Sequence, residues 1–309
     1  MRVLVADPYY SLDEVAEILG DLAEIELADA PWEGDDVVGL LVSPDQPVGV
    51  AELDRLPALR IVATCSVGYD NIDTDAAADR GIWVCNVPDY CVEEMADSSL
   101  ALVLALMRGV VTLDRSVRDG EWDHAVAGPL RTNRGTRLGV IGFGRIGRAL
   151  ATRALALGFE VCAVDPQLPD EAISGYGVHP LSLDEALSTC EVFSLHSLLT
   201  NETRGMIGAD EIAKMPRGAL LVDTARAALV DFDAVLAALD SGHLGGAAFD
   251  VLPVEPPSAE APAPERPTLI VNPHAAWYSP ATEREAYRRP AVSVREALEG
   301  RRPTDALAP

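Results

Sequence analysis

Residues 138–147 read LGVIGFGRIG, a short apolar run that ends in a glycine pattern. The apolar run predicts a buried strand, and the apolar residues that follow at helical spacing predict a helix. A strand that ends in G-x-G-x-x-G and opens a helix is typical of dinucleotide-binding folds. The glycines there permit a tight turn, a close approach of the pyrophosphate and close packing of the helix on the strand. Such glycine patterns also arise by chance, so a turn that binds nothing stays the alternative.

The residues of this turn are predicted cofactor contacts. Gly142, Gly144 and Gly147 are the three glycines of the pattern. Arg145 and Ile146 begin the predicted helix, whose free N–H groups and positive dipole end attract phosphates. Arg145 adds a positive charge beside them.

Asp165 is expected to select the cofactor. It follows the next predicted strand, about 20 residues after the first glycine, where an acid binds the ribose hydroxyls of the adenosine. No Arg or Lys occurs between Asp165 and Arg204, so nothing cationic would receive a 2′-phosphate. The sequence therefore predicts NAD rather than NADP.

Strands and helices alternate on both sides of this turn, which predicts doubly wound parallel sheets. An apolar helix over residues 92–109 is expected to carry the chain between two domains. The predicted strands cover residues 3–6, 37–42, 61–64, 82–85, 138–141, 160–164, 191–195, 219–223, 246–250 and 269–271. We therefore predict an α/β protein with two doubly wound parallel-sheet domains. A Rossmann domain of residues 99–282 is inserted into a smaller flavodoxin-like domain of residues 1–98 and 283–309.

Composition excludes several classes of partner. The 309 residues contain 49 acidic and 24 Lys or Arg side chains, a formal net charge of −25 that repels nucleic acid and anionic membrane surfaces. Coding bias and adaptation to high salt both stay open as its origin. The five cysteines show no C-x-x-C spacing, so neither a disulfide nor a metal site is predicted. No apolar stretch reaches the ~18 residues of a membrane helix, and the run after Met1 is too short for a signal peptide, so we expect a cytoplasmic protein.

Three polar residues follow strands of the second predicted sheet. Arg226, Glu255 and His274 each lie just beyond a strand. Ligands of open α/β sheets bind outside the carboxyl ends of the strands, so these side chains are expected to converge on one site. Taken singly, each has a plainer interpretation: a solvated loop arginine, a surface acid in the proline-rich segment 253–267, and a structural histidine. Their shared position favours the joint interpretation.

Five sequence strings together carry a specific resemblance. They are CSVGYDNID at 65–73, VCNVP at 84–88, VDTAR at 222–226, DV at 250–251 with EP at 255–256, and NPHAAWYS at 272–279. In order and spacing they resemble the D-isomer-specific 2-hydroxyacid dehydrogenase family, over residues 61 to 282. Residues 86–94 and 274–279 are most similar to the branch that contains the C-terminal-binding-protein corepressors.

The resemblance implies a catalytic role for three residues. His274 would donate a proton to the keto oxygen during reduction and remove it during oxidation, since imidazole titrates near neutral pH. Glu255 would orient this imidazole and favour its charged form. Arg226 would bind the carboxylate or keto oxygen of the substrate through its planar set of donors.

The resemblance also implies contacts to substrate and cofactor. Ser66, Val67 and Gly68, in the smaller domain, would present backbone N–H groups to the substrate carboxylate, and Trp277 would wall the substrate pocket. Asp250 would hold the carboxamide of the nicotinamide. The predicted cofactor contacts beyond the glycine turn are Asp165, His196, Thr224 and Asp250.

Two positions depart from the family pattern. Ala227 and Ala228 follow the arginine where the family usually has glycine, so a positive φ there would be costly. Leu198 replaces the proline of the family's His-x-Pro-Leu-Thr run. Both changes concern loop geometry. Formate dehydrogenases of the family have glutamine beside the histidine, so Glu255 argues against formate.

The sequence therefore predicts an NAD-dependent D-2-hydroxyacid dehydrogenase that transfers a hydride between nicotinamide and C2 of a small 2-hydroxy or 2-keto acid. An NAD(H)-responsive binding protein similar to the corepressors, with little turnover, is the alternative, and a lyase or hydrolase that uses NAD internally is a third. The identity of the acid and the physiological direction stay open. The resemblance implies a homodimer, with the cofactor domain and residues 120–134 as the contact.

Overall fold

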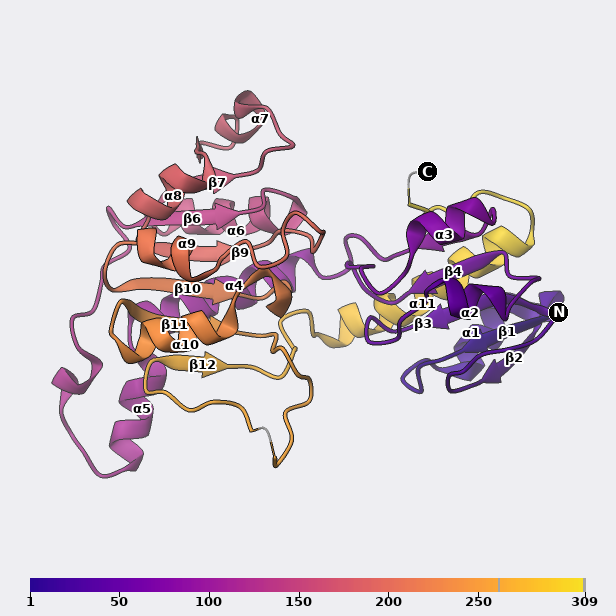
Figure 1. Ribbon diagram of the computed structural model, residues 1–309, viewed down its shortest axis with the longest axis horizontal. Helices are drawn as coiled ribbons and strands as arrows, with labels where there is room; N and C mark the ends of the chain where they lie inside the picture. The colour runs from indigo at the N-terminus through magenta and orange to yellow at the C-terminus, as the bar shows by residue number, and fades with distance from the viewer. Residues whose placement is uncertain (261, 308–309) are drawn as a thin grey trace. The chain divides into compact units, whose positions relative to one another are not determined.

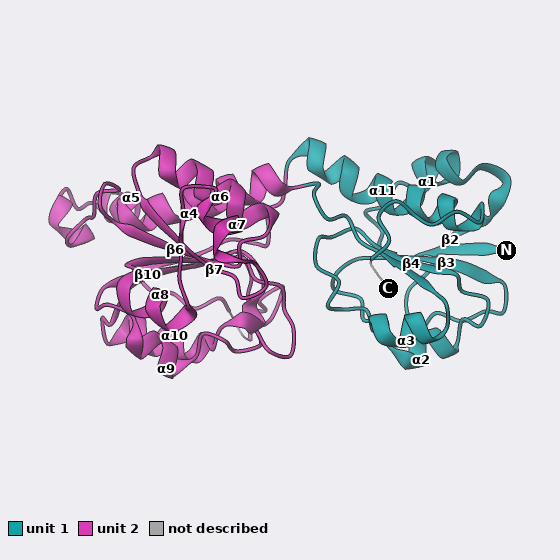
Figure 2. Cartoon of the chain, turned by 90° about the horizontal axis from the view of Figure 1, so that it is seen from above, with its two compact units in different colours: residues 1–90, 279–309 teal, residues 91–278 magenta. Residues whose placement is uncertain are grey.

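The computed structural model describes residues 1–260 and 262–307 (Figure 1). It divides into two compact units, drawn in teal and magenta in Figure 2. Unit 1 comprises Met1–Tyr90 and Ser279–Pro309, and unit 2 comprises Cys91–Tyr278. Residue 261 of the proline-rich segment and residues 308–309 of the predicted smaller domain lie outside the described residues.

Unit 2 contains a seven-stranded, all-parallel sheet in the order β12-β11-β10-β9-β6-β7-β8. Its strands are β6 (Arg137–Ile141), β7 (Glu160–Val164), β8 (His179–Pro180), β9 (Val192–Leu195), β10 (Ala219–Asp223), β11 (Leu244–Phe249) and β12 (Leu269–Val271). Counted from β6 as the first strand, this is the 3-2-1-4-5-6 order of the Rossmann fold with a seventh strand added. The order reverses between β6 and β9, which places the glycine turn at the switch point.

Helices cover both faces of this sheet, which explains why its strands are nearly continuous apolar runs. The helices of unit 2 are α4 (Val92–Met107), α5 (Val110–Arg118), α6 (Arg145–Ala156), α7 (Asp170–Ser174), α8 (Leu183–Thr189), α9 (Ala209–Lys214) and α10 (Phe232–Asp240). Residues of α4 and α6 share one buried cluster with Val140 and Val161. Residues of α8, α9 and α10 share the other cluster with Ile141 and Phe193. The two cores hold the strand ends, and so the loops beyond them, in fixed positions.

Unit 1 contains a five-stranded parallel sheet in the order β2-β1-β3-β4-β5. Its elements are β1 (Arg2–Val5), α1 (Leu12–Leu19), β2 (Glu24–Leu27), β3 (Val37–Val42), α2 (Val50–Asp54), β4 (Ile61–Thr64), α3 (Thr74–Asp79), β5 (Trp83–Cys85) and α11 (Pro280–Leu298). This strand order is that of flavodoxin-like folds. The predicted fold of two doubly wound domains, one inserted into the other, is thus confirmed.

Helix α11 comes from the far end of the chain and completes the core of unit 1. Its small apolar residues share a buried cluster with β1, β3 and β4. Gly39 in β3 leaves room for it, because a Cβ at Gly39 would lie only 3.1 Å from Cγ1 of Val294. Burial of these apolar side chains supplies the main driving force for docking the helix.

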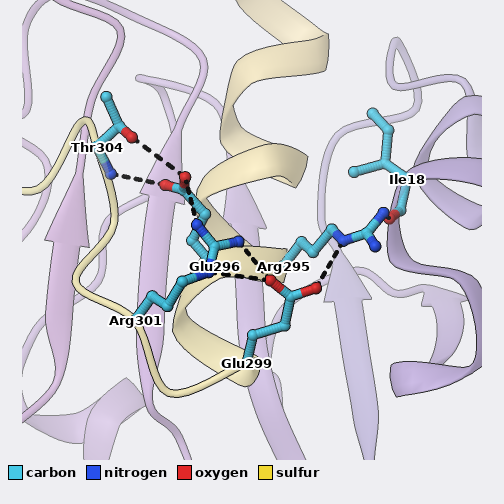
Figure 3. A network of polar contacts seen from close by, with 6 residues as sticks. All are labelled: Ile18, Arg295, Glu296, Glu299, Arg301 and Thr304. Carbon is cyan, nitrogen blue, oxygen red and sulfur yellow. Dashed lines mark hydrogen bonds and ion pairs between the residues drawn. The ribbon is translucent and has the colours of Figure 1, made fainter.

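Polar contacts fasten the end of α11 (Figure 3). Arg295 donates to the main-chain oxygen of Ile18 at 3.0 Å and to Glu299 at 2.9 Å. Arg301 pairs with Glu296 and Glu299, and the N–H of Thr304 donates to Glu296 at 2.7 Å. Exposed pairs of this kind each contribute little to stability. Apolar packing therefore holds the helix, and these pairs help to fix its position along its axis.

The divisions between the compact units fall at 90/91 and 278/279, whereas the predicted domain limits of 98/99 and 282/283 lie inside α4 and α11. Each helix packs as a whole with one unit: α4 with α6, β10 and β11, and α11 with β3 and β4. In the described part of the chain, no single helix combines the length and the apolar character needed to cross a membrane. The pair α4 and α5, bent by 60°, meets those criteria only when counted together.

Candidate active site

The glycine turn after β6 has room where a pyrophosphate would need it. Gly142 has a φ of 95°, and a Cβ there would lie 2.6 Å from the main-chain carbon of His196. A Cβ at Gly147 would lie 2.2 Å from the oxygen of Gly142. At Gly144, by contrast, a Cβ would meet no atom within 4 Å. Two glycines are therefore required by the protein itself, and the third borders open space.

Helix α6 starts in this open space, and its first residues are Arg145 and Ile146. Its N-cap is Gly144, and no side-chain hydrogen bond caps it in the described structure. Asp165 lies at the end of the adjacent strand β7, where its carboxylate accepts the N–H of Phe143 at 2.9 Å and that of Gln167 at 3.1 Å. Open space, an uncapped helix N-terminus and a neighbouring carboxylate together fit a bound dinucleotide.

His196 borders the same turn, in the loop that follows β9. Its Nε2 lies 2.8 Å from Oγ of Ser194, and its main chain packs against Gly142. The residue keeps some exposed surface, yet the ring is enclosed by protein atoms, and this desolvation lowers the pKa of His196 to about 4. The imidazole is therefore neutral at physiological pH and serves as a hydrogen-bonding group.

His274 and Glu255 form an ion pair. Nδ1 of His274 lies 2.7 Å from Oε2 of Glu255, and Oε1 of Glu255 accepts the N–H of Leu252 at 2.5 Å. The hydrogen bond to Glu255 raises the pKa of His274 above its ordinary value, although burial opposes this. Burial raises the pKa of Glu255, but the hydrogen bonds from His274 and Leu252 outweigh it, so the net pKa lies below the ordinary value. Each member of the pair thus favours the charged form of the other.

Arg226 belongs to the same site. It follows β10, and its Nη1 donates to the main-chain oxygen of Ala225 at 2.9 Å. Its positive charge lies close enough to act on both members of the ion pair, lowering the pKa of Glu255 and opposing the rise at His274. The structure therefore brings together the arginine, the acid and the histidine that the sequence predicted to converge.

Asp250 fastens the loop that carries His274. Its carboxylate accepts the N–H of Ala275 at 2.9 Å and that of Ala276 at 2.8 Å, and its main-chain oxygen accepts the N–H of His274 at 2.8 Å. Sequence reasoning missed this role, because Asp250 was singled out only as a cofactor contact. The indole of Trp277 lies in the same loop and donates to the oxygen of His274 at 3.0 Å.

Asp223, at the end of β10, is a further buried acid that sequence reasoning missed. Its Oδ1 accepts the N–H of Ala225 at 2.8 Å, while Oδ2 has no hydrogen-bond partner among the described residues. Burial raises the pKa of Asp223 to about 7, although the N–H groups of Ala225 and Arg226 oppose it. The only signal in the sequence is an acid that ends an otherwise apolar strand. The next residue, Thr224, pairs its hydroxyl with that of Ser99 at 2.8 Å.

The predicted substrate loop lies in unit 1, directly after β4. Oγ of Ser66 donates to the main-chain oxygen of Gly68 at 2.6 Å, and the amide of Asn86 donates to the oxygen of Val67 at 2.7 Å. These bonds occupy carbonyl groups of the loop. Ser66, Val67 and Gly68 therefore form an ordered turn at the carboxyl edge of the unit 1 sheet.

The two family departures are accommodated locally. Ala227 and Ala228 lie in a short 3-10 helix, Ala227–Leu229, and neither has a positive φ. The predicted cost of a left-handed conformation therefore does not arise at these positions. Leu198 is exposed in the loop after β9.

Comparisons with known proteins agree with this geometry. Residues 100–276 match the family model described as D-isomer specific 2-hydroxyacid dehydrogenase, NAD binding domain. The chain is 35% identical over 302 residues to the D-3-phosphoglycerate dehydrogenase of Bacillus subtilis (strain 168). The match covers 96% of this chain but only 56% of that longer protein. It is 34% identical over 285 residues to the glycerate dehydrogenase of Methylorubrum extorquens, with 87% of each chain covered.

A solved structure is also similar to this chain over nearly its whole length. The D-lactate dehydrogenase of Aquifex aeolicus, complexed with NAD and lactic acid, superposes with a TM-score of 0.87 at 27% identity, over 97% of this chain and 96% of that chain.

Proposed function

The chain belongs to the D-isomer-specific 2-hydroxyacid dehydrogenase family, and on that premise we propose that it is an NAD-dependent enzyme that interconverts a small 2-keto acid and its D-2-hydroxy acid. The observation that carries this proposal is the ion pair of His274 and Glu255, within range of the charge of Arg226. An imidazole whose protonated form is favoured, beside a guanidinium, suits an anionic 2-keto acid. The named relatives act on substrates of this class.

His274 is the proposed acid and base. Because Nδ1 bonds Glu255, Nε2 is left to face the substrate, donating a proton to the keto oxygen in reduction and accepting one from the hydroxyl in oxidation. Glu255 fixes the direction of the ring and stabilises the imidazolium. NAD, when bound, accepts or supplies the hydride.

Arg226 is the proposed anchor for the substrate, binding its carboxylate or keto oxygen. We propose further substrate contacts from the turn of Ser66, Val67 and Gly68, which follows a strand end of unit 1, and from Trp277. The proposed contacts to NAD are Gly142, Gly144, Arg145, Ile146, Gly147, Asp165, His196, Thr224 and Asp250. The carboxylate of Asp165 supports a preference for NAD over NADP, because it would repel a 2′-phosphate.

The proposal extends to a homodimer in the cytoplasm. Several large apolar side chains are exposed on α5 and the segment after it, among them Trp122 at 91% exposure. Their set is Val110, Val117, Trp122, Val126 and Leu130. Exposed apolar surface is typical of protein interfaces, and Trp122, Val126 and Leu130 lie within the predicted contact at residues 120–134. Trp122→Glu should convert dimer to monomer in light scattering, whereas Tyr278→Phe should not.

NADH oxidation with glyoxylate, hydroxypyruvate and phenylpyruvate tests the activity. We expect turnover with at least one of these acids, and its loss in His274→Ala. Tight NADH binding without turnover on a broad panel of 2-keto acids would instead favour the corepressor-like alternative.

A further inference from the structure

His274 has an unusual main-chain conformation. Its φ of 52° makes it the only non-glycine residue with positive φ in the part of the chain that the structure describes. L-residues rarely occupy the left-handed region, because Cβ crowds the following carbonyl oxygen. Such residues persist where surrounding contacts hold them, and they concentrate at functional sites.

Three hydrogen bonds hold the main chain of His274 and of the two residues that follow it. All three end on Asp250: its main-chain oxygen takes the N–H of His274, and its two carboxylate oxygens take those of Ala275 and Ala276. Asp250 is almost fully buried at the end of β11, so this anchor is rigid. On the next peptide, Oγ of Ser98 donates to the oxygen of Ala276 at 3.0 Å.

The carbonyl oxygen of His274, on the same peptide as the N–H of Ala275, accepts a hydrogen bond from a second group. Nε1 of Trp277 reaches back three residues and donates to the oxygen of His274 at 3.0 Å. The indole is itself partly buried and packs edge-on against the ring of Tyr278, with centroids 5.7 Å apart and planes at 87°. The N–H groups anchored on Asp250 and this carbonyl bond together fix the peptide planes on both sides of the His274 Cα.

We propose that Trp277 is a positioning residue for the acid–base histidine. Together with the bond from the Ala275 N–H to Asp250 on the same peptide, its indole N–H fixes the carbonyl of His274. These bonds set the direction in which the imidazole leaves the main chain and so its alignment with Glu255. This rests on the proposed role of His274, and it gives Trp277 a task beyond walling the substrate pocket. Displacement of the imidazole by ~1 Å would lower the reaction rate by about 100-fold.

The test separates the indole N–H from the indole surface. Trp277→Phe removes the donor and keeps an aromatic ring. A second variant carries β-(3-benzothienyl)alanine at position 277, which keeps the bicyclic shape and exchanges only the N–H for sulfur, so that folding is preserved. Tyr278→Phe is the matched control, because it alters the neighbouring ring and leaves the bond to His274 intact.

Two readouts are measured on the NAD-bound protein: steady-state kinetics, and the pKa of the His274 imidazole by NMR titration, with His274→Ala as the assignment control. We expect both variants at 277 to lower kcat about tenfold, with less than twofold change in KM for the benzothienyl variant, which keeps the bicyclic ring. They should also move the imidazole pKa down toward its ordinary value, because the bond to Glu255 loosens. Tyr278→Phe should change neither.

A benzothienyl variant with wild-type kcat and wild-type imidazole pKa would overturn the proposal, and a rise in KM confined to Trp277→Phe would assign Trp277 to the pocket wall alone. The NMR titration needs no turnover. Absence of activity in the wild type would therefore count against the proposed function, while the imidazole pKa would still decide the role of Trp277.

Discussion

Two histidines follow strands of the same parallel sheet and have opposite electrostatics. His274, after β12, has a carboxylate at 2.7 Å, and its pKa is raised by that hydrogen bond. His196, after β9, has a hydroxyl at 2.8 Å, and desolvation lowers its pKa to about 4. A place at the carboxyl edge of a sheet therefore does not make a histidine an acid–base group. The partner of the ring nitrogen and the packing around the ring decide whether the pKa of a histidine is raised or lowered.

The largest expected effect comes from removing the ring of His274. His274→Ala should lower kcat/KM for NADH-dependent reduction ~10³-fold, because general acid catalysis is lost. His196→Gln, which keeps a polar group near Nε2, should leave the pH profile of kcat/KM unchanged. Steady-state kinetics and NADH titration of both variants check this. A comparable loss of rate in both would erase the distinction between the two histidines.

The partner of His274 can be neutralised without removing it. Glu255→Gln keeps the reach to Nδ1 and the bond to Leu252 but loses the charge that raises the imidazole pKa. Reduction needs the imidazolium, so the alkaline limb of kcat/KM should move to lower pH. The loss in kcat/KM relative to wild type should therefore be larger at pH 8 than at pH 6. A pH–rate profile that does not move would separate Glu255 from the protonation of His274.

The lowered pKa of His196 predicts a dependence of stability on acid. Its folded pKa of about 4 lies below the unfolded value of 6.5, so the unfolded chain binds the extra proton first. Stability is therefore expected to fall as the pH drops from 6.5 toward 4, by ~1 kcal/mol from this residue once its remaining exposure is allowed for. Urea unfolding of wild type and His196→Gln at pH 7 and pH 4.5 measures it. Between pH 7 and pH 4.5, wild type should lose more stability than His196→Gln. At pH 7 the two proteins should differ less.

The smallest effect is the contribution of the ion pair itself to stability. Because the pKa of His274 is raised in the folded protein, its contribution to stability is complete below pH 6.5. That contribution is lost as the pH rises through the folded pKa. Because the pKa of Glu255 is lowered in the folded protein, its contribution to stability is complete above pH 4.5. That contribution is lost as the pH falls through the folded pKa. A double-mutant cycle at pH 5.5 should give a coupling of ~0.5 kcal/mol, because both side chains are about one third exposed. The same cycle at pH 9 should give less, and equal couplings would contradict the assigned shifts.

Local sequence pattern was enough to predict most of the buried strands. The bounds of β10 and β12 match residues 219–223 and 269–271, because apolar runs between turn residues define buried strands. The pattern failed for β2, Glu24–Leu27, a mostly exposed edge strand whose alternating acids do not resemble a core strand. It also missed β8, which has only two residues. Edge strands carry little apolar signal.

The candidate site likewise has a part that the sequence predicts and a part that it does not. Arg226, Glu255 and His274 were predictable because topology sends the carboxyl ends of neighbouring parallel strands to one edge. The neutral state of His196 and the clamp of Asp250 on the His274 loop were not, since both depend on which atoms face each other after folding. Charge state is a tertiary property, whereas position at a strand end is readable from the chain.

The return of α11 to the core of unit 1 has a consequence for biosynthesis. The ribosome makes the five strands of unit 1 first, but the helix that covers Val3, Ile61 and Ala63 emerges only after all of unit 2. At ~5–20 residues per second, those ~190 intervening residues delay completion of the first core by about 10–40 s. The inserted unit is continuous in the chain, so all of its residues are available before those of the first core. During that delay the apolar face of the nascent strands lacks the helix that covers it in the folded protein.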